Sequence, residues 1–131
     1  MDPVKEFRYE EVAGKFFPII SVAIESNGKG ILTRAYVDSG ASFSIFDSQV
    51  AEYLDIDFRK GEKVFPRGIG GHICAYLNPV TIYIEDIGIP CKVLFSDELV
   101  VKFNLLGRAG FFDRFKVCFD DKEEILHLYE R

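Results

Sequence analysis

An acidic residue at the end of an apolar run is the strongest chemical signal in this sequence. Asp38 follows Ala35 to Val37, and Ser39 and Gly40 come directly after it. Taken alone, Asp-Ser-Gly is an ordinary turn, because all three residue types favour turns. A carboxylate held in place at a strand end can also act as a general acid or base. Other parts of the chain must therefore decide between a turn and a site.

Two further segments make a site the better interpretation. A glycine-rich run, Gly68 to Gly71, follows Asp38 and predicts a mobile hairpin tip. Farther along, Leu105, Leu106 and Gly107 precede Arg108. The glycine-rich run lacks the Lys-Ser/Thr of a phosphate-binding loop and the helix of a dinucleotide site. No histidine or lysine stands at a recognisable spacing from a serine, so a serine hydrolase is not indicated either.

The elements that must position these residues are mostly strands. Ile20, Val22 and Ile24 alternate with less apolar residues, which predicts a half-buried strand. A turn at 27–30 and a second strand over 31–37 lead to Asp38. A short strand over 44–46 follows, and Asp47 is a suitable N-cap for a helix over 48–54, with one face formed by Val50, Tyr53 and Leu54.

The remaining segments continue this pattern. Further strands are predicted over 63–67, 80–84 and 89–95, and a terminal hairpin joins 116–119 to 125–129. Residues 108–115 could form a short helix with Phe111, Phe112 and Phe115 facing inward. Residues 1–15 are mixed and charged, which suggests a loose or partly paired arm. We therefore expect one mostly-β domain over residues 1–131, with about eight or nine short strands and one or two short helices.

Composition limits the partners and the setting. The 131 residues suit a single domain, and a net charge of -5 argues against nucleic acid as a partner. The three cysteines, Cys74, Cys91 and Cys118, have no disulfide or zinc-module spacing, so we expect buried thiols in a reducing compartment. The charged N-terminus does not resemble a secretory signal, and no apolar run is long enough for a membrane helix. We expect a soluble cytoplasmic protein with no metal, no cofactor and no membrane partner.

Three segments, taken in order, resemble the retropepsins, the single-domain aspartic proteases of retroviruses and their cellular and prokaryotic relatives. Residues 35–42 are similar to the catalytic loop of that family. Residues 68–73 are similar to its flap, and residues 104–108 to the segment that passes beneath the catalytic loop. The resemblance spans roughly residues 17–128. The segment over 45–54 is similar to a helix of the non-viral, prokaryotic branch.

The resemblance implies an acid-protease barrel that forms a two-fold homodimer. It implies Asp38 as the catalytic residue, with Ser39, Gly40 and Ala41 supporting the loop. It further implies a flap that binds substrate, made by Ile69, Gly70 and Gly71, and structural residues beneath the loop, namely Leu105, Leu106, Gly107 and Arg108. Viral members usually carry an Asp where this chain has Ser42. Arg108 could therefore bond a backbone carbonyl, Asp47 or Asp113.

Catalysis by carboxylates requires two of them that share a proton, and this chain has one Asp-Ser-Gly. The pair must then come from Asp38 of two chains about a two-fold axis. The favoured interpretation is a homodimeric aspartic endopeptidase acting on a peptide or protein substrate. A dimeric peptide-binding or dimerisation module of the same fold, with negligible turnover, is the alternative, and an unrelated β-barrel binding protein is a third.

Overall fold

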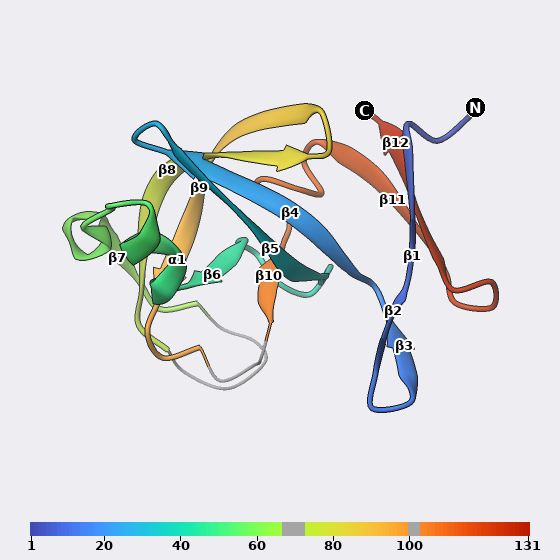
Figure 1. Ribbon diagram of the computed structural model, residues 1–131, viewed down its shortest axis with the longest axis horizontal. Coiled ribbons are helices and arrows are strands. Elements are labelled where there is room, and N and C mark those ends of the chain that lie inside the picture. The colour runs from blue at the N-terminus through green and yellow to red at the C-terminus, as the bar shows by residue number, and fades with distance from the viewer. Residues whose placement is uncertain (67–72, 100–102) are drawn as a thin grey trace.

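The computed structural model describes residues 1–66, 73–99 and 103–131. These residues form twelve strands, one α-helix and one short 3-10 helix, η1 (Figure 1). The first half contains β1 (Lys5–Arg8), β2 (Glu10–Val12), β3 (Lys15–Phe17), β4 (Ile19–Ser26), β5 (Lys29–Val37), β6 (Ile45–Asp47), α1 (Ser48–Tyr53), η1 (Phe58–Lys60) and β7 (Glu62–Val64). The second half contains β8 (Ala75–Ile84), β9 (Ile87–Ser96), β10 (Asn104–Leu106), β11 (Phe115–Asp120) and β12 (Ile125–Glu130).

Seven of these strands form a closed sheet. Their order is β4-β5-β10-β6-β9-β8-β7, and β4 also pairs with β8, so that the sheet curls into a barrel. Most neighbours are antiparallel, whereas β10 runs parallel to β5 and β6 runs parallel to β9. Because β10 lies between β5 and β6, residues near positions 37 and 106 meet inside one sheet.

The β4–β5 hairpin forms as the alternating pattern predicts. Val22 and Ile24 are buried in the barrel, Ala23 between them is half-buried, and the flanking Ser21 and Glu25 are exposed. Asn27 and Gly28 have φ angles of 53° and 73°, the positive values that a two-residue hairpin turn needs. This hairpin carries the chain to Asp38 at the end of β5.

The helix α1 begins where the sequence predicts. The Asp47 side chain accepts a hydrogen bond from the Gln49 main-chain nitrogen at 2.9 Å, which makes Asp47 its N-cap. Val50 and Leu54 are buried against the barrel core. Tyr53, expected on the same face, is 53% exposed, and Lys29 lies over its ring. The short helix turns Tyr53 toward solvent because only its opposite side meets the barrel.

A separate three-stranded sheet joins the two ends of the chain, with the order β1-β12-β11. The expected C-terminal hairpin forms between β11 and β12. The N-terminal residues, expected to be loose or partly paired, are paired: Lys5 to Arg8 lie antiparallel to residues 125–128. Tyr9 adds an anchor, since its side chain is largely buried and its hydroxyl donates to Asp121 Oδ1 at 2.6 Å. The charged residues of this segment do not indicate a strand, but alternate side chains of β1 are partly buried.

The predicted helix over 108–115 is wrong. The described chain makes turns there, because Gly110 has a φ angle of 94° and Ala109 forms a β-bridge with Phe43. Phe111 and Phe115 are nevertheless fully buried, as their apolar character indicated. The turns direct the Phe111 and Phe115 side chains into the core, as a helix would have done, without a helical conformation at Gly110.

The structure has twelve strands where eight or nine were expected. Five of them, β2, β3, β6, β7 and β10, have only three residues each and are too short to show a period, and β2, β3 and β10 are among the unexpected ones. Within residues 1–66, 73–99 and 103–131, no helix has the length and apolar character needed to cross a membrane.

Candidate active site

Asp38 lies where β5 leaves the barrel sheet. Its main-chain nitrogen donates to the Leu106 carbonyl at 2.9 Å, which continues the β5–β10 pairing by one more bond. Its Oδ1 accepts a hydrogen bond from the Gly40 nitrogen at 2.9 Å. Residues 38–40 therefore form a turn and also carry the candidate catalytic carboxylate. The turn fixes the direction of a half-buried carboxyl group.

The residues after Asp38 form a tight loop. The Ala41 nitrogen donates to the Asp38 carbonyl at 3.2 Å, and Ala41 is buried. Ser39 and Gly40 are exposed in the single chain. A Cβ atom at Gly40 would lie 3.2 Å from Asp38 Oδ1, a closer approach than side chains normally make. Glycine therefore keeps space open beside the carboxylate.

The segment 105–107 lies directly beneath this loop. Leu106 is fully buried and pairs in register with Val37, and Leu105 is buried beside Tyr36. A Cβ atom at Gly107 would collide with the Phe43 carbonyl and would lie 2.7 Å from the Ala41 carbonyl oxygen. The loop can approach β10 this closely only because residue 107 has no side chain.

Ser44 joins the two segments. Its hydroxyl is completely buried, donates to the Ala109 carbonyl at 2.9 Å and accepts from the Gly107 nitrogen at 3.0 Å. The sequence analysis places residue 44 in a short strand and considers serines only as nucleophiles, so it does not predict this structural role. No local motif signals it, because both partners are main-chain groups more than 60 positions away.

Arg108 holds the other side of the loop. Its main-chain nitrogen donates to the Ala41 carbonyl at 2.8 Å, and its side-chain Nε donates to the Ser39 carbonyl at 3.0 Å. Of the three partners considered for this side chain, the structure therefore has the backbone carbonyl. Asp47 instead caps α1, and the Asp113 nitrogen donates to the Arg108 carbonyl at 3.0 Å.

Asn104 is a second polar residue that the sequence analysis missed. It is buried, accepts from the Asp47 nitrogen at 2.8 Å, and donates to Thr33 Oγ1 at 3.0 Å and the Arg34 carbonyl at 3.1 Å. It thereby joins β5 to the start of α1 through β10. Its position directly before the apolar pair Leu105 and Leu106 could have indicated a buried polar residue.

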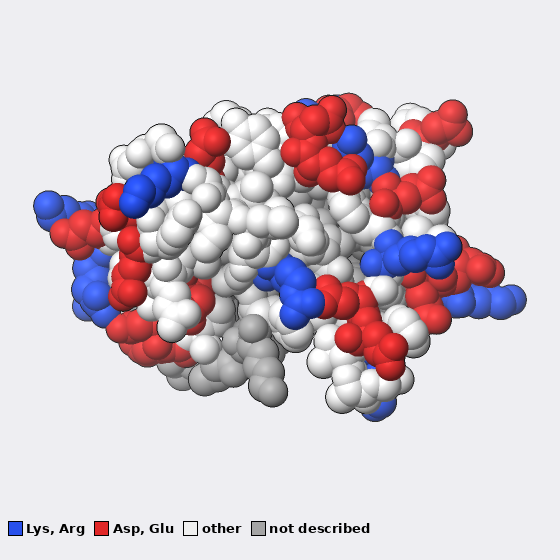
Figure 2. Space-filling view, in the orientation of Figure 1, with Lys and Arg blue, Asp and Glu red and all other residues white. Residues whose placement is uncertain are grey.

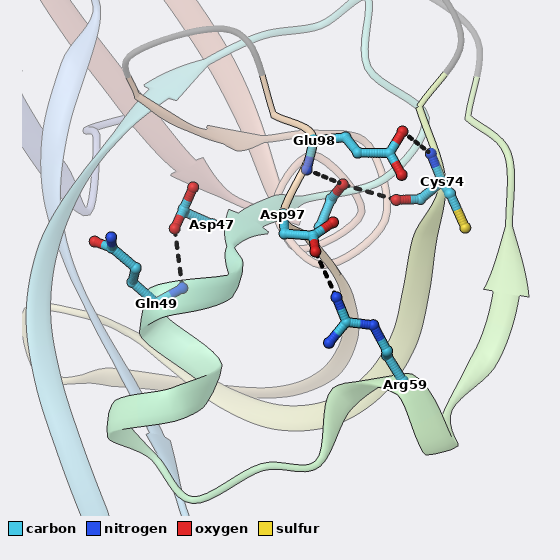
Figure 3. A network of polar contacts seen from close by, with 7 residues as sticks. Asp47, Gln49, Arg59, Cys74, Asp97 and Glu98 are labelled. Atoms are coloured by element: carbon cyan, nitrogen blue, oxygen red, sulfur yellow. Dashed lines mark hydrogen bonds and ion pairs between the residues drawn. The ribbon is translucent and has the colours of Figure 1, made fainter.

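Ile69, Gly70 and Gly71, the predicted flap residues, lie outside the described residues. The chain that follows them is held at Cys74, as Figure 3 shows. The Cys74 nitrogen donates to Glu98 Oε1 at 3.3 Å, and the Cys74 carbonyl accepts from the buried Ser96 hydroxyl at 2.7 Å. The Glu98 nitrogen donates to the same hydroxyl at 3.0 Å. The start of β8 is thus fixed to the end of β9.

An ion pair reinforces the same region. Arg59 of η1 pairs with Asp97, directly between Ser96 and Glu98 (Figure 3). Both side chains are about half exposed, so this pair adds little stability by itself. Its effect is positional, because it links η1 to the turn that holds Cys74.

Tyr36 lies two residues before Asp38 and lines the same region. Burial raises the pKa of its phenol above the ordinary value, and the nearby negative charges of Asp38 and Asp121 raise it further. Tyr36 therefore stays neutral through the physiological range. Its ring lies against Phe17, with centroids 6.1 Å apart.

Comparison with protein-family models gives no match, and comparison with curated proteins gives none either. Solved structures do match. The chain is similar to a retropepsin-like aspartic protease from Rickettsia conorii, with 22% identity, a TM-score of 0.67 and coverage of 95% of this chain and 91% of that one. It is also similar to the EIAV protease in complex with the inhibitor HBY-793, with 22% identity, a TM-score of 0.52 and coverage of 76% and 88%.

Both likenesses have a probability of 1.00 and span most of each chain. At 22% identity they bear on the fold of the chain. The chain has the fold of the retropepsin-like aspartic proteases.

Proposed function

We propose that this protein is a homodimeric aspartic endopeptidase whose catalytic pair consists of Asp38 from two copies of the chain. The observation that carries the proposal is the attachment of the Asp38 loop to β10. Main-chain bonds join Asp38 to Leu106 and Arg108 to Ala41, and the Arg108 side chain holds Ser39. These bonds hold the Asp38 loop in one position, as a carboxylate that must meet its counterpart from a second chain requires.

A second chain is required by the chemistry. General acid–base hydrolysis of a peptide needs one group to activate water and another to protonate the carbonyl oxygen. The sequence contains a single Asp-Ser-Gly, so one chain supplies one such carboxylate. A two-fold axis that passes beside Asp38 places the same residue from each copy in contact.

The two carboxylates then act as one titrating unit. Two like charges about 3 Å apart cannot both ionise, so the pair retains one proton over a wide pH range. The ionised member takes a proton from water, which attacks the peptide carbonyl carbon. The protonated member donates to the carbonyl oxygen as the tetrahedral intermediate forms. Proton transfer to the leaving nitrogen then completes cleavage of the C–N bond.

The remaining roles follow the resemblance. Ser39 braces the loop across the axis, and Gly40 leaves room for the substrate backbone. Ile69, Gly70 and Gly71 close over an extended peptide and donate main-chain N–H groups to it. Three free cysteines favour a reducing compartment, and we place the enzyme in the cytoplasm.

Incubation with a diverse peptide mixture between pH 4 and pH 7 tests the proposal. The wild-type protein should cleave peptides at a rate that rises more steeply than linearly with protein concentration. Asp38→Asn should be inactive while it keeps the same far-UV circular dichroism. A stable dimer that binds peptides without cleaving any of them would instead identify a peptide-binding module of this fold.

A further inference from the structure

The β2–β3 hairpin stands apart from the rest of the molecule. Among the described strands, β2 and β3 pair only with each other and belong to neither larger sheet. Figure 1 shows the hairpin projecting beyond the barrel and beyond the terminal sheet. An isolated two-stranded hairpin is only marginally stable in water, so a projecting one is expected to gain a partner surface.

The base of this hairpin is fixed beside the candidate catalytic residue. The Val37 nitrogen, next to Asp38, donates to the Pro18 carbonyl at 2.9 Å, directly after β3 ends. The Phe17 ring packs against Tyr36, and Glu10 forms an ion pair with Arg34. The hairpin therefore leaves the body from the side of Asp38, in a direction set by three separate contacts.

The far end of the hairpin makes few contacts with its own chain. Phe16 is 47% exposed, and a Cβ atom at Gly14 would meet no atom of the described chain within 4 Å. Glu11 and Phe16 are directly paired across the two strands, so both side chains leave from the same face. In Figure 2 the lower part of this lobe is mostly uncharged, with basic atoms at its tip and acidic side chains above. The face presents an aromatic ring beside a carboxylate.

We propose that the β2–β3 hairpin is an arm that grips a second copy of this chain, with Phe16 as its apolar anchor. This inference rests on the proposed function, which brings a second copy up to Asp38. A second copy that places its Asp38 against the Asp38 of the first copy must also come close to the base of the first copy's hairpin. That base contacts Val37 and Tyr36, one and two residues before Asp38. The hairpin then extends over that copy's surface.

Exposed groups on the hairpin and on a second copy can make the local contacts that such a pairing needs. Each chain carries a net charge of -5, so two copies repel each other over distance, and contact needs apolar burial and local pairing. Phe16 supplies the apolar contact. Glu11 is exposed, and a second copy offers the exposed Arg108 at its own catalytic loop. Aromatic residues, phenylalanine among them, and arginine are enriched in protein–protein interfaces.

The dimerisation constant tests the arm directly. Sedimentation equilibrium of the full chain should show that Phe16→Ser raises the dimer dissociation constant about tenfold or more, the usual effect of removing an aromatic anchor. Tyr53→Ser is the matched control, because Tyr53 is similarly exposed but lies on α1. It should leave the constant within about twofold of wild type. Thermal unfolding of both variants checks that neither change disrupts the fold.

A second measurement locates the contact. With p-benzoylphenylalanine at position 16, irradiation should yield a covalent dimer whose crosslink joins residue 16 to a second copy. The same group at position 53 should not. A wild-type dimer that Phe16→Ser leaves unchanged, with no crosslink from position 16, overturns the arm and leaves the proposed function intact. A wild-type chain that stays monomeric at every concentration overturns both.

Discussion

The Arg108 side chain donates its Nε–H to the main-chain carbonyl of Ser39, 3.0 Å away and 69 positions earlier in the chain. The viral pattern that this chain resembles has an Asp where this chain has Ser42. In this chain Arg108 donates to the backbone of the loop that carries Asp38. The loop is therefore held by a charged donor without an ion pair between side chains. This hydrogen bond attaches the loop to residue 108 through the main chain of Ser39.

Replacement of Arg108 should therefore reduce catalysis more than stability. Arg108→Ala removes one hydrogen bond from an exposed guanidinium, worth about 1 kcal/mol of unfolding free energy. The peptide-cleavage rate at saturating substrate should fall at least about tenfold, because small displacements of catalytic groups are costly. Urea unfolding and steady-state kinetics on one preparation measure both. Equal losses of stability and rate in Arg108→Ala and in an exposed-residue control such as Lys116→Ala would contradict this role.

Loss of the Ser44 hydroxyl should be more damaging to folding. Ser44→Ala leaves the Gly107 nitrogen and the Ala109 carbonyl without their buried partner, at a cost of about 2 to 3 kcal/mol. Urea unfolding should show this loss, and Ser44→Thr should recover part of it by restoring the hydroxyl. The exposed Ser42, changed to alanine, serves as the control and should lose less than about 0.5 kcal/mol.

Gly107 should not tolerate a methyl group. In Gly107→Ala the new Cβ would press on the carbonyl oxygens of Phe43 and Ala41, and these are main-chain atoms that cannot rotate away. We expect a loss of about 3 kcal/mol or more in unfolding free energy, measured by denaturant titration. Gly30→Ala is the matched change, since its Cβ would lie 3.8 Å from the Ile24 carbonyl oxygen, an ordinary contact. Similar losses in both variants would contradict the close approach.

Much of the barrel could be predicted from the sequence, because strands with one buried face show a period of two. The hairpin that leads to Asp38 and the capped helix α1 both follow such local signals. The turn chemistry of Asn27 and Gly28 fixes the register locally as well. Each of these features depends on residues close together in the chain.

The features that could not be predicted depend on distant main-chain groups. Ser44 bonds to residues 107 and 109, and Ser96 and Glu98 hold Cys74. Nothing in the local sequence distinguishes such polar residues from surface ones. Over residues 108–115 the local sequence gives a signal, but a misleading one. Apolar spacing there fits a helix, but the bridge from Ala109 to Phe43 and the φ angle of Gly110 prevent one.

Tyr9 should make stability depend on alkaline pH. Burial, followed by the hydrogen bond to Asp121, raises the pKa of its phenol in the folded state. The stabilisation is therefore fully present below the unfolded-state pKa of about 10, and it is lost as pH rises from there toward the folded-state pKa. Tyr9→Phe should lose about 1 kcal/mol at pH 8. Urea unfolding at pH 8 and pH 10.5 should show a smaller difference between the two proteins at the higher pH. A difference that grows with pH would contradict this assignment.

Mixing wild-type chains with Asp38→Asn chains tests the central claim most directly. If every site takes one Asp38 from each of two copies, a mixed dimer lacks half of its catalytic pair and is inactive. After subunit exchange at constant total concentration, activity should fall with the square of the wild-type fraction, to about one quarter in an equal mixture. Activity that falls only in proportion to the wild-type fraction, to about one half, would show that each chain works alone and would contradict the shared site.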